Sequence, residues 1–133
     1  MDFQHKELRT VKKTVHRLGL AANYGLDEAG VRSAFERGVN YVFYTNLRNG
    51  KVHGPLREAI RKDREKVVVA AVPLLGFYGG GVRSGCEGIL RDLGVEYLDV
   101  LQLGWLGVTS AWTDGVDEEL VKLRESGKVR ALG

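Results

Sequence analysis

One run of glycines has a spacing that could hold a phosphate group. Gly79-Gly80-Gly81 lies between a strand-like and a helix-like segment, and bare N–H groups at the start of a helix bind anions. A P-loop also needs Lys followed by Ser or Thr, which does not follow here. Asn23-Tyr24-Gly25 follows the first strand-like segment in place of the dinucleotide signature G-x-G-x-x-G. The glycine run is therefore interpreted as a flexible loop.

Other reactive side chains also give little support for chemistry. Cys86 is the single cysteine, so the chain forms no internal disulfide or thiolate metal cluster. At a helical apolar position it is expected to be a small buried hydrophobe. Residues 6–17 alternate basic and apolar types without interleaved aromatics, and the net charge is only +3. We therefore expect a solvated hairpin rather than a nucleic-acid interface.

The segments that must position any site are short and apolar. The 133 residues are 44% hydrophobic, enough for the core of one domain. The 18 glycines lie between periodic segments, which indicates many tight strand–helix junctions. We predict strands over residues 17–22, 39–45, 66–72 and 97–103, the start of a fifth over 129–132, and a helix after each of the first four. No apolar run reaches 18 residues and the N-terminus is charged, so we expect a cytoplasmic protein without membrane contact.

The order of these segments predicts an α/β protein with a parallel sheet. Residues 67–72 are apolar throughout, as in strands that are covered on both faces. Alternating strands and helices with short connections give right-handed crossovers. An open doubly wound sheet and part of a closed barrel both fit this pattern, and periodicity does not choose between them.

Five stretches, taken in order, resemble the first half of the aldo-keto reductase family. They are residues 17–20 with 23–25, 35–41, 64–70, 93–103 and 123–133. The resemblance implies the N-terminal half of a (β/α)8 TIM barrel, with about four and a half β/α units in a single partial domain over residues 1–133. Residues 1–16 would be the N-terminal hairpin or arm that plugs the barrel floor. An open sheet would require this ordered likeness to be chance.

The resemblance also implies a chemistry and a set of positions for it. Aldo-keto reductases pass a hydride between NADPH and a carbonyl, with a Tyr as proton donor assisted by Lys, Asp and His. An ammonium and an imidazole are needed because a phenol with a pKa near 10 must release a proton at neutral pH. Carried onto this chain, all four positions differ from the family: Phe43 or Tyr44 stands at the Asp position, Asn49 (or Arg48) at the Tyr, Val72 at the Lys and Gly104 at the His.

Several other residues are weighed as parts of the site. Tyr44 could serve as the acid if it points into the mouth, or it could fill the barrel. His53 could reach the mouth or stay on the surface. Arg48 and Lys51 could attract an anion or face water. By analogy, Asn23 and Tyr24 would lie near the nicotinamide, and Trp105 and Trp112 would form one wall of the substrate pocket.

Two functions follow from this resemblance. The first is an NADP-dependent oxidoreductase acting on a small-molecule carbonyl, here truncated and inactive as given. The alternative is a non-catalytic, barrel-derived binding or scaffold module that has lost the catalytic tetrad. A closed barrel needs roughly 200 residues or more. We therefore expect inward side chains of every strand to meet water, and open edges that lead to self-association or to pairing with a missing C-terminal half.

Overall fold

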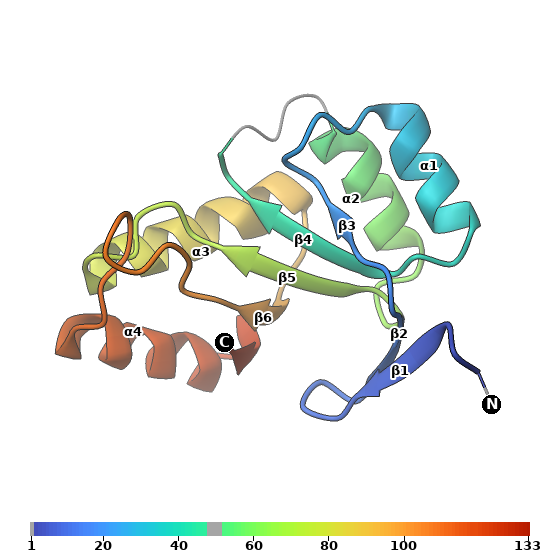
Figure 1. Cartoon of the computed structure of the whole chain (residues 1–133). Helices are drawn as coiled ribbons and strands as arrows, with labels where there is room; N and C mark the ends of the chain where they lie inside the picture. The colour runs from blue at the N-terminus through green and yellow to red at the C-terminus, as the bar shows by residue number, and fades with distance from the viewer. Residues whose placement is uncertain (1, 48–51) are drawn as a thin grey trace.

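The computed structural model describes residues 2–47 and 52–133 and contains one curved parallel sheet (Figure 1). Its strands lie in chain order, β3-β4-β5-β6-β7, and neighbours pair in parallel. This order confirms the predicted barrel half, because an open doubly wound sheet would reverse its strand order near the middle. The strands are β3 (Leu20–Ala21), β4 (Tyr41–Thr45), β5 (Val68–Val72), β6 (Leu98–Leu101) and β7 (Val129–Leu132).

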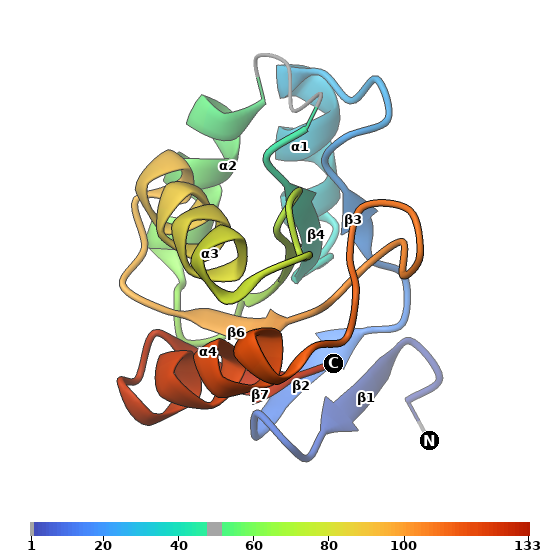
Figure 2. The same ribbon diagram turned by 90° about the vertical axis from the view of Figure 1, so that its left-hand side faces the viewer.

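A helix follows each of the first four sheet strands and covers the outer face of the sheet (Figures 1 and 2). The helices are α1 (Glu28–Glu36), α2 (His53–Lys62), α3 (Gly79–Leu93) and α4 (Asp114–Glu125). Asp27 and Thr113 cap α1 and α4 by accepting N–H bonds from Gly30 and Val116. Gly94, at φ +62°, ends α3. Within the described residues no helix is long and apolar enough to cross a bilayer.

The main core lies between the sheet and these helices. Val42, Tyr44, Val69 and Ala71 alternate along their strands with residues of the opposite face and pack against the helices. The buried helix residues on this side are Val31, Leu56, Ile60, Val82, Cys86, Ile89, Leu93, Val116, Leu120 and Leu123. Burial of large apolar side chains, each worth about 1.5–3 kcal/mol, therefore stabilises the packing of the helices on the sheet.

The inner face of the sheet is better covered than the sequence suggested. Val68, Ala70 and Val72 of β5 point inward, yet they are at most 4% exposed. Two of these side chains are valines and one is an alanine, and the curvature of the sheet brings their neighbours close. The expectation that every strand leaves inward side chains in water is therefore wrong for the central strand. Inward residues of the other strands, such as Tyr41, Phe43 and Val100, are only half-buried.

The first residues form an antiparallel hairpin of β1 (His5–Leu8) and β2 (Lys13–His16). It lies across the amino ends of the sheet strands (Figure 2). Leu8, Val11 and Val15 of the hairpin pack against inward residues of four strands and form a second, smaller core. Those strand residues are Tyr41, Val68, Val100 and Ala131. The hairpin thus closes the lower end of the barrel half.

A buried charge cluster fastens this hairpin to the sheet. The Lys13 ammonium lies 2.7 Å from Asp99 Oδ1 and donates to the Val67 carbonyl at 2.8 Å. The Arg64 guanidinium lies 2.9 Å from Asp99 Oδ2, which also accepts the Val69 N–H. Both Lys13 and Asp99 are buried, with side chains 5% and 0% exposed. The expectation that the basic hairpin is simply solvated is therefore wrong for Lys13.

Aromatic stacking extends the same cluster to the last strand. The Tyr97 ring lies between two guanidinium groups, with Arg64 Cζ 3.8 Å and Arg130 Cζ 3.7 Å from its centroid. The Tyr97 hydroxyl is also 3.3 Å from Lys13 Nζ. Hairpin, β6 and β7 are therefore tied together at one end of the sheet.

Replacement of Lys13 tests how much this cluster contributes to the free energy of unfolding. Lys13→Ala leaves the buried Asp99 carboxylate with one cation, so we expect the free energy of unfolding to fall by about 3–5 kcal/mol. Lys66→Ala is the control, since Lys66 pairs with Asp63 at the surface and exposed pairs are worth about 0–1 kcal/mol. Urea unfolding of both variants gives the comparison. Equal losses of unfolding free energy in the two variants would contradict a stabilising role for the buried cluster.

Candidate functional site

The candidate site lies at the carboxyl ends of the sheet strands, where barrels of this type carry their chemistry. Two of the positions singled out in the sequence meet there. A β-carbon placed on Gly104 would lie 2.8 Å from Val72 Cγ1, well inside van der Waals contact. The Val72 side chain therefore occupies the space that any side chain at position 104 would need. Val72 itself is buried.

Phe43 and Tyr44 face opposite sides of the sheet. Phe43 pairs with Ala70 and faces inward, next to the strand that carries Val72. Tyr44 faces outward, is fully buried among the helices, and donates its hydroxyl proton to Asp92 Oδ2 of α3 at 3.3 Å. The expectation that Tyr44 points into the mouth or fills the barrel is therefore wrong, because alternate strand residues face opposite sides of a sheet.

His53 is the exposed first residue of α2, one of the helices on the outer face of the sheet. The remaining position carried over from the family, Asn49, lies outside the described residues together with Arg48 and Lys51. Within the described parts of the chain, no three His, Cys, Asp or Glu side chains gather as a metal site would require. Burial raises the pKa of the Cys86 thiol to about 11, so this cysteine is a poor nucleophile at neutral pH.

Asn23 has a structural task at the mouth that the sequence did not reveal. Its amide donates to the Thr45 carbonyl at 3.0 Å and accepts the Thr45 N–H at 3.2 Å. It also donates to the Leu47 carbonyl. The side chain thereby continues the pairing of β3 with β4 beyond Ala22, whose N–H donates to the Phe43 carbonyl. β3 itself covers only Leu20–Ala21 and is shorter than the predicted strand. Tyr24, the next residue, is largely exposed.

Two loops form an apolar wall beside this site. The loop after β5 and the loop after β6 are joined at Gly76, whose N–H donates to Thr109 and whose carbonyl accepts from Ala111. A β-carbon on Gly76 would lie 2.4 Å from Ser110 Oγ, so only glycine allows this close approach. The wall comprises the exposed side chains of Leu75, Phe77, Tyr78, Trp105, Leu106 and Trp112.

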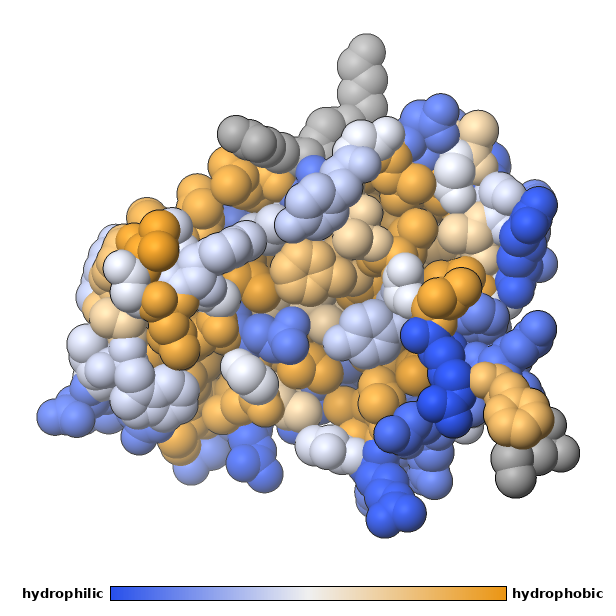
Figure 3. Space-filling model, viewed as in Figure 1, coloured by the Kyte–Doolittle hydropathy of each residue, from blue (hydrophilic) through white to orange (hydrophobic). Residues whose placement is uncertain are grey.

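The wall is uncharged and locally strained. Residues 72–78 and 101–113 contain no charged side chain. Trp105 adopts φ +53°, a left-handed conformation that is uncommon for a bulky residue. Its carbonyl accepts the N–H groups of Val108 and Thr109, which hold the loop in place. In Figure 3 apolar and weakly polar atoms gather at the left-hand end of the molecule, where these loops lie.

Comparison with solved structures identifies the fold. An aldo-keto reductase from Bacillus halodurans, in its holo form, superposes with a TM-score of 0.76 at 21% identity, covering 99% of this chain and 50% of its own. An aldo-keto reductase from Klebsiella pneumoniae in complex with NADPH superposes with a TM-score of 0.75 at 23% identity, covering 97% of this chain and 49% of its own. An aldo/keto reductase from the same organism, with NADP and acetate, has a TM-score of 0.72 at 25% identity, covering 92% of this chain and 46% of its own.

The resemblance and the half-barrel fold predicted from the sequence are therefore confirmed. The chain spans about half the length of the solved structures that it matches. No protein-family model and no curated protein matches it by sequence.

The packing of Gly104 on Val72 predicts a specific stability pattern. Gly104→Ala should cost about 1–3 kcal/mol of unfolding free energy through overpacking. In the Val72→Ala background the same change should cost less, with a coupling energy of about 0.5–3 kcal/mol. Gly54→Ala is the control, because a β-carbon there meets nothing within 4 Å. It should be neutral or stabilising by up to about 1 kcal/mol. Additive losses in denaturant titrations would rule out the contact.

Proposed function

We propose that this chain is the N-terminal half of an aldo-keto-reductase-type barrel that binds a small uncharged molecule at its mouth and does not itself reduce carbonyls. The contact between Gly104 and Val72 carries this proposal. By resemblance, an imidazole and an ammonium would stand at these two positions. Here Gly104 offers no side chain, and Val72 offers an apolar one that lies where a β-carbon at position 104 would go.

The proton chemistry has no replacement among the described residues near the inner face. A carbonyl that accepts a hydride also needs a proton at its oxygen, and a positioned acid contributes roughly 10²–10⁴ in rate. The Tyr44 hydroxyl donates a hydrogen bond to Asp92 of α3, on the outer side of the sheet. His53 is the first residue of α2, another helix on that side. Phe43 faces inward and offers no charge; by resemblance, it or Tyr44 stands where the family has an Asp.

The uncharged wall indicates the chemical class of the proposed ligand. Trp105, Trp112 and Phe77 present aromatic surface without a neighbouring charge in either loop. Pockets lined in this way favour apolar ligands and place few polar groups to orient them. A carboxylate or phosphate would lose hydration there without gaining a partner. The ligand is therefore an uncharged molecule with an apolar ring or chain.

NADP-dependent reduction by a complete barrel is the second candidate. Two of the similar structures were solved with NADP or NADPH. In such a protein Tyr24 would be available to the nicotinamide, whereas the amide of Asn23 is engaged by Thr45 and Leu47. This chain would then supply the apolar wall and part of the cofactor-binding site.

A reductase assay tests the first candidate against the second. The purified chain should oxidise no NADPH above the protein-free rate with a panel of aliphatic and aromatic aldehydes, because the ammonium and imidazole positions are filled. The Klebsiella pneumoniae reductase that binds NADPH serves as the positive control. Turnover that follows the protein through gel filtration and disappears in Trp105→Ala would contradict the proposal.

Ligand binding is measurable without any cofactor. Both tryptophans of the chain lie in the wall, so two indole N–H signals in a nitrogen-15 spectrum report on it directly. Benzaldehyde should shift both signals, and benzoate should bind at least tenfold more weakly because the wall offers no cation. Phe3→Ala, an exposed aromatic at the opposite end of the chain, is the control. Equal binding of the acid and the aldehyde would refute the ligand class.

A further inference from the structure

The two strands of the hairpin place a pair of histidines directly opposite each other. His5 of β1 and His16 of β2 are partners in the antiparallel register. The His16 N–H donates to Asn40 Oδ1 rather than across the hairpin, whereas the Arg17 N–H donates to the Gln4 carbonyl of the other strand. His5 and His16 therefore form a non-hydrogen-bonded pair, the kind in which facing side chains lie closer together.

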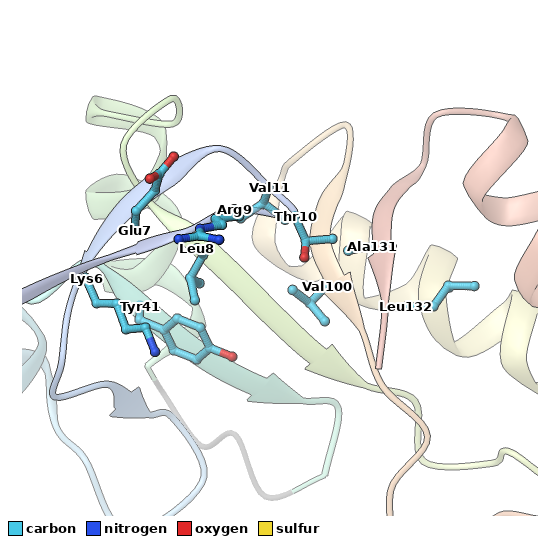
Figure 4. A pocket seen from close by; sticks show the side chains of 10 residues that line it. All are labelled: Lys6, Glu7, Leu8, Arg9, Thr10, Val11, Tyr41, Val100, Ala131 and Leu132. Atoms are coloured by element: carbon cyan, nitrogen blue, oxygen red, sulfur yellow. The ribbon is translucent and has the colours of Figure 1, made fainter.

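The histidine pair lies on the side of the hairpin that points away from the sheet. Lys6 and Leu8 extend toward Tyr41 of the sheet, whereas Glu7 extends the opposite way (Figure 4). Side chains alternate between the two faces along a strand, so His5 shares the outer face with Glu7. The pair is therefore separate from the small core that joins the hairpin to the sheet.

The two imidazole rings are spaced as in a shared metal site. Their centroids lie 5.4 Å apart, and their planes are inclined at 87°, so the rings do not stack on each other. Two imidazoles that share one zinc ion, each with a Zn–N bond of about 2.0–2.1 Å, have ring centres on the order of 5 Å apart. Both side chains are only half-buried, so an ion can reach them from water.

The Nδ1 atom of each ring already has a partner. His5 Nδ1 lies 2.7 Å from Asp2 Oδ2. His16 Nδ1 lies 3.0 Å from the Leu18 amide nitrogen and 3.3 Å from the Leu18 carbonyl oxygen. Neither Nε2 atom has a hydrogen-bond partner among the described residues. Histidines that bind metals commonly donate one ring N–H to a carboxylate or a backbone carbonyl and hold the ion with the other nitrogen.

We propose that the Nε2 atoms of His5 and His16 bind a divalent transition cation, for which Zn²⁺ serves as the probe, and that Asp2 orients the His5 ring. Imidazole is a preferred ligand of zinc, copper and nickel. Among the described residues no third His, Cys, Asp or Glu completes the pair as a ligand, so water fills the remaining positions. The carboxylates of Asp2 and Glu7 add negative charge on this side of the hairpin, which favours a cation.

This site goes beyond the proposed function, because it lies on the hairpin at the amino ends of the sheet strands and not at the mouth (Figure 2). When the ion occupies both Nε2 atoms, the Leu18 carbonyl accepts the Nδ1 proton of His16 and the Asp2 carboxylate accepts that of His5. The ion then joins β1 to β2 and stabilises the folded hairpin by binding to the native state alone.

A zinc titration of the nitrogen-15-labelled full chain tests the site. The chain has three histidines, His5, His16 and His53, so each ring reports separately. Zinc sulfate should shift the ring nitrogen signals of His5 and His16 together and leave those of His53, on the exposed start of α2, unchanged. Magnesium sulfate is the control ion, since Mg²⁺ prefers oxygen ligands and should shift none of the three.

Three variants locate the ligands by isothermal titration with zinc. His5→Gln and His16→Gln should each weaken binding at least tenfold, because either change leaves a single imidazole. Asp2→Asn should weaken it about tenfold, the lower end of the usual effect of losing such a partner. His53→Gln is the matched control and should change the affinity less than twofold.

Each variant is first checked for the cooperative melting of the parent chain, so that a loss of binding is not a loss of folding. Zinc that shifts no histidine signal, or shifts all three rings alike, would overturn the proposal. A His16→Gln variant that binds zinc as tightly as the parent would also overturn it, since the ion would then be held from one strand only. None of these results depends on NADPH turnover or on benzaldehyde binding.

Discussion

The buried carboxylate of Asp99 is the constraint on which the rest of the structure depends. A fully buried charge is costly unless it is paired and hydrogen-bonded. Here Lys13 pairs with Asp99 Oδ1, and Arg64 and the Val69 N–H donate hydrogen bonds to Oδ2. These partners come from the hairpin, from the turn that follows α2, and from β5. One charge therefore fixes where the hairpin lies and how β5 and β6 meet. The Tyr97 stack carries the same constraint to β7 through Arg130.

This cluster lies near the amino ends of β5 and β6, at the end of the sheet opposite the candidate site. The floor and the helix-covered outer face hold the strands in register, and the main core reaches the carboxyl ends of the strands through Ala22, Ala71 and Leu101. At the candidate site the Val72 side chain lies where a β-carbon at Gly104 would go, and the two residues form an apolar contact.

The sequence predicted the parallel order because the alternation of strands and helices is a local signal. The caps seen in the structure, Asp27 at the start of α1 and Gly94 at the end of α3, also act within a few residues. It could not predict the direction of Tyr44, since a shift of one residue moves a strand side chain to the opposite face. It also missed the Lys13–Asp99 pair, whose partners are far apart in the chain, and the strand-like pairing made by the Asn23 amide. Each of these depends on tertiary contacts that leave no local pattern.

We propose that the mouth lacks the groups needed to complete a hydride transfer. The most direct measurement is a single-turnover experiment with excess chain, an aldehyde, and NADPH that carries deuterium at the transferring position of the nicotinamide. Mass spectrometry of the alcohol then reports transfer even when turnover is far too slow for a steady-state assay. If the chain transfers no hydride, the alcohol contains no deuterium beyond the level in the protein-free control. Stoichiometric incorporation would contradict this proposal and would mean that the apolar contact between Val72 and Gly104 does not prevent catalysis.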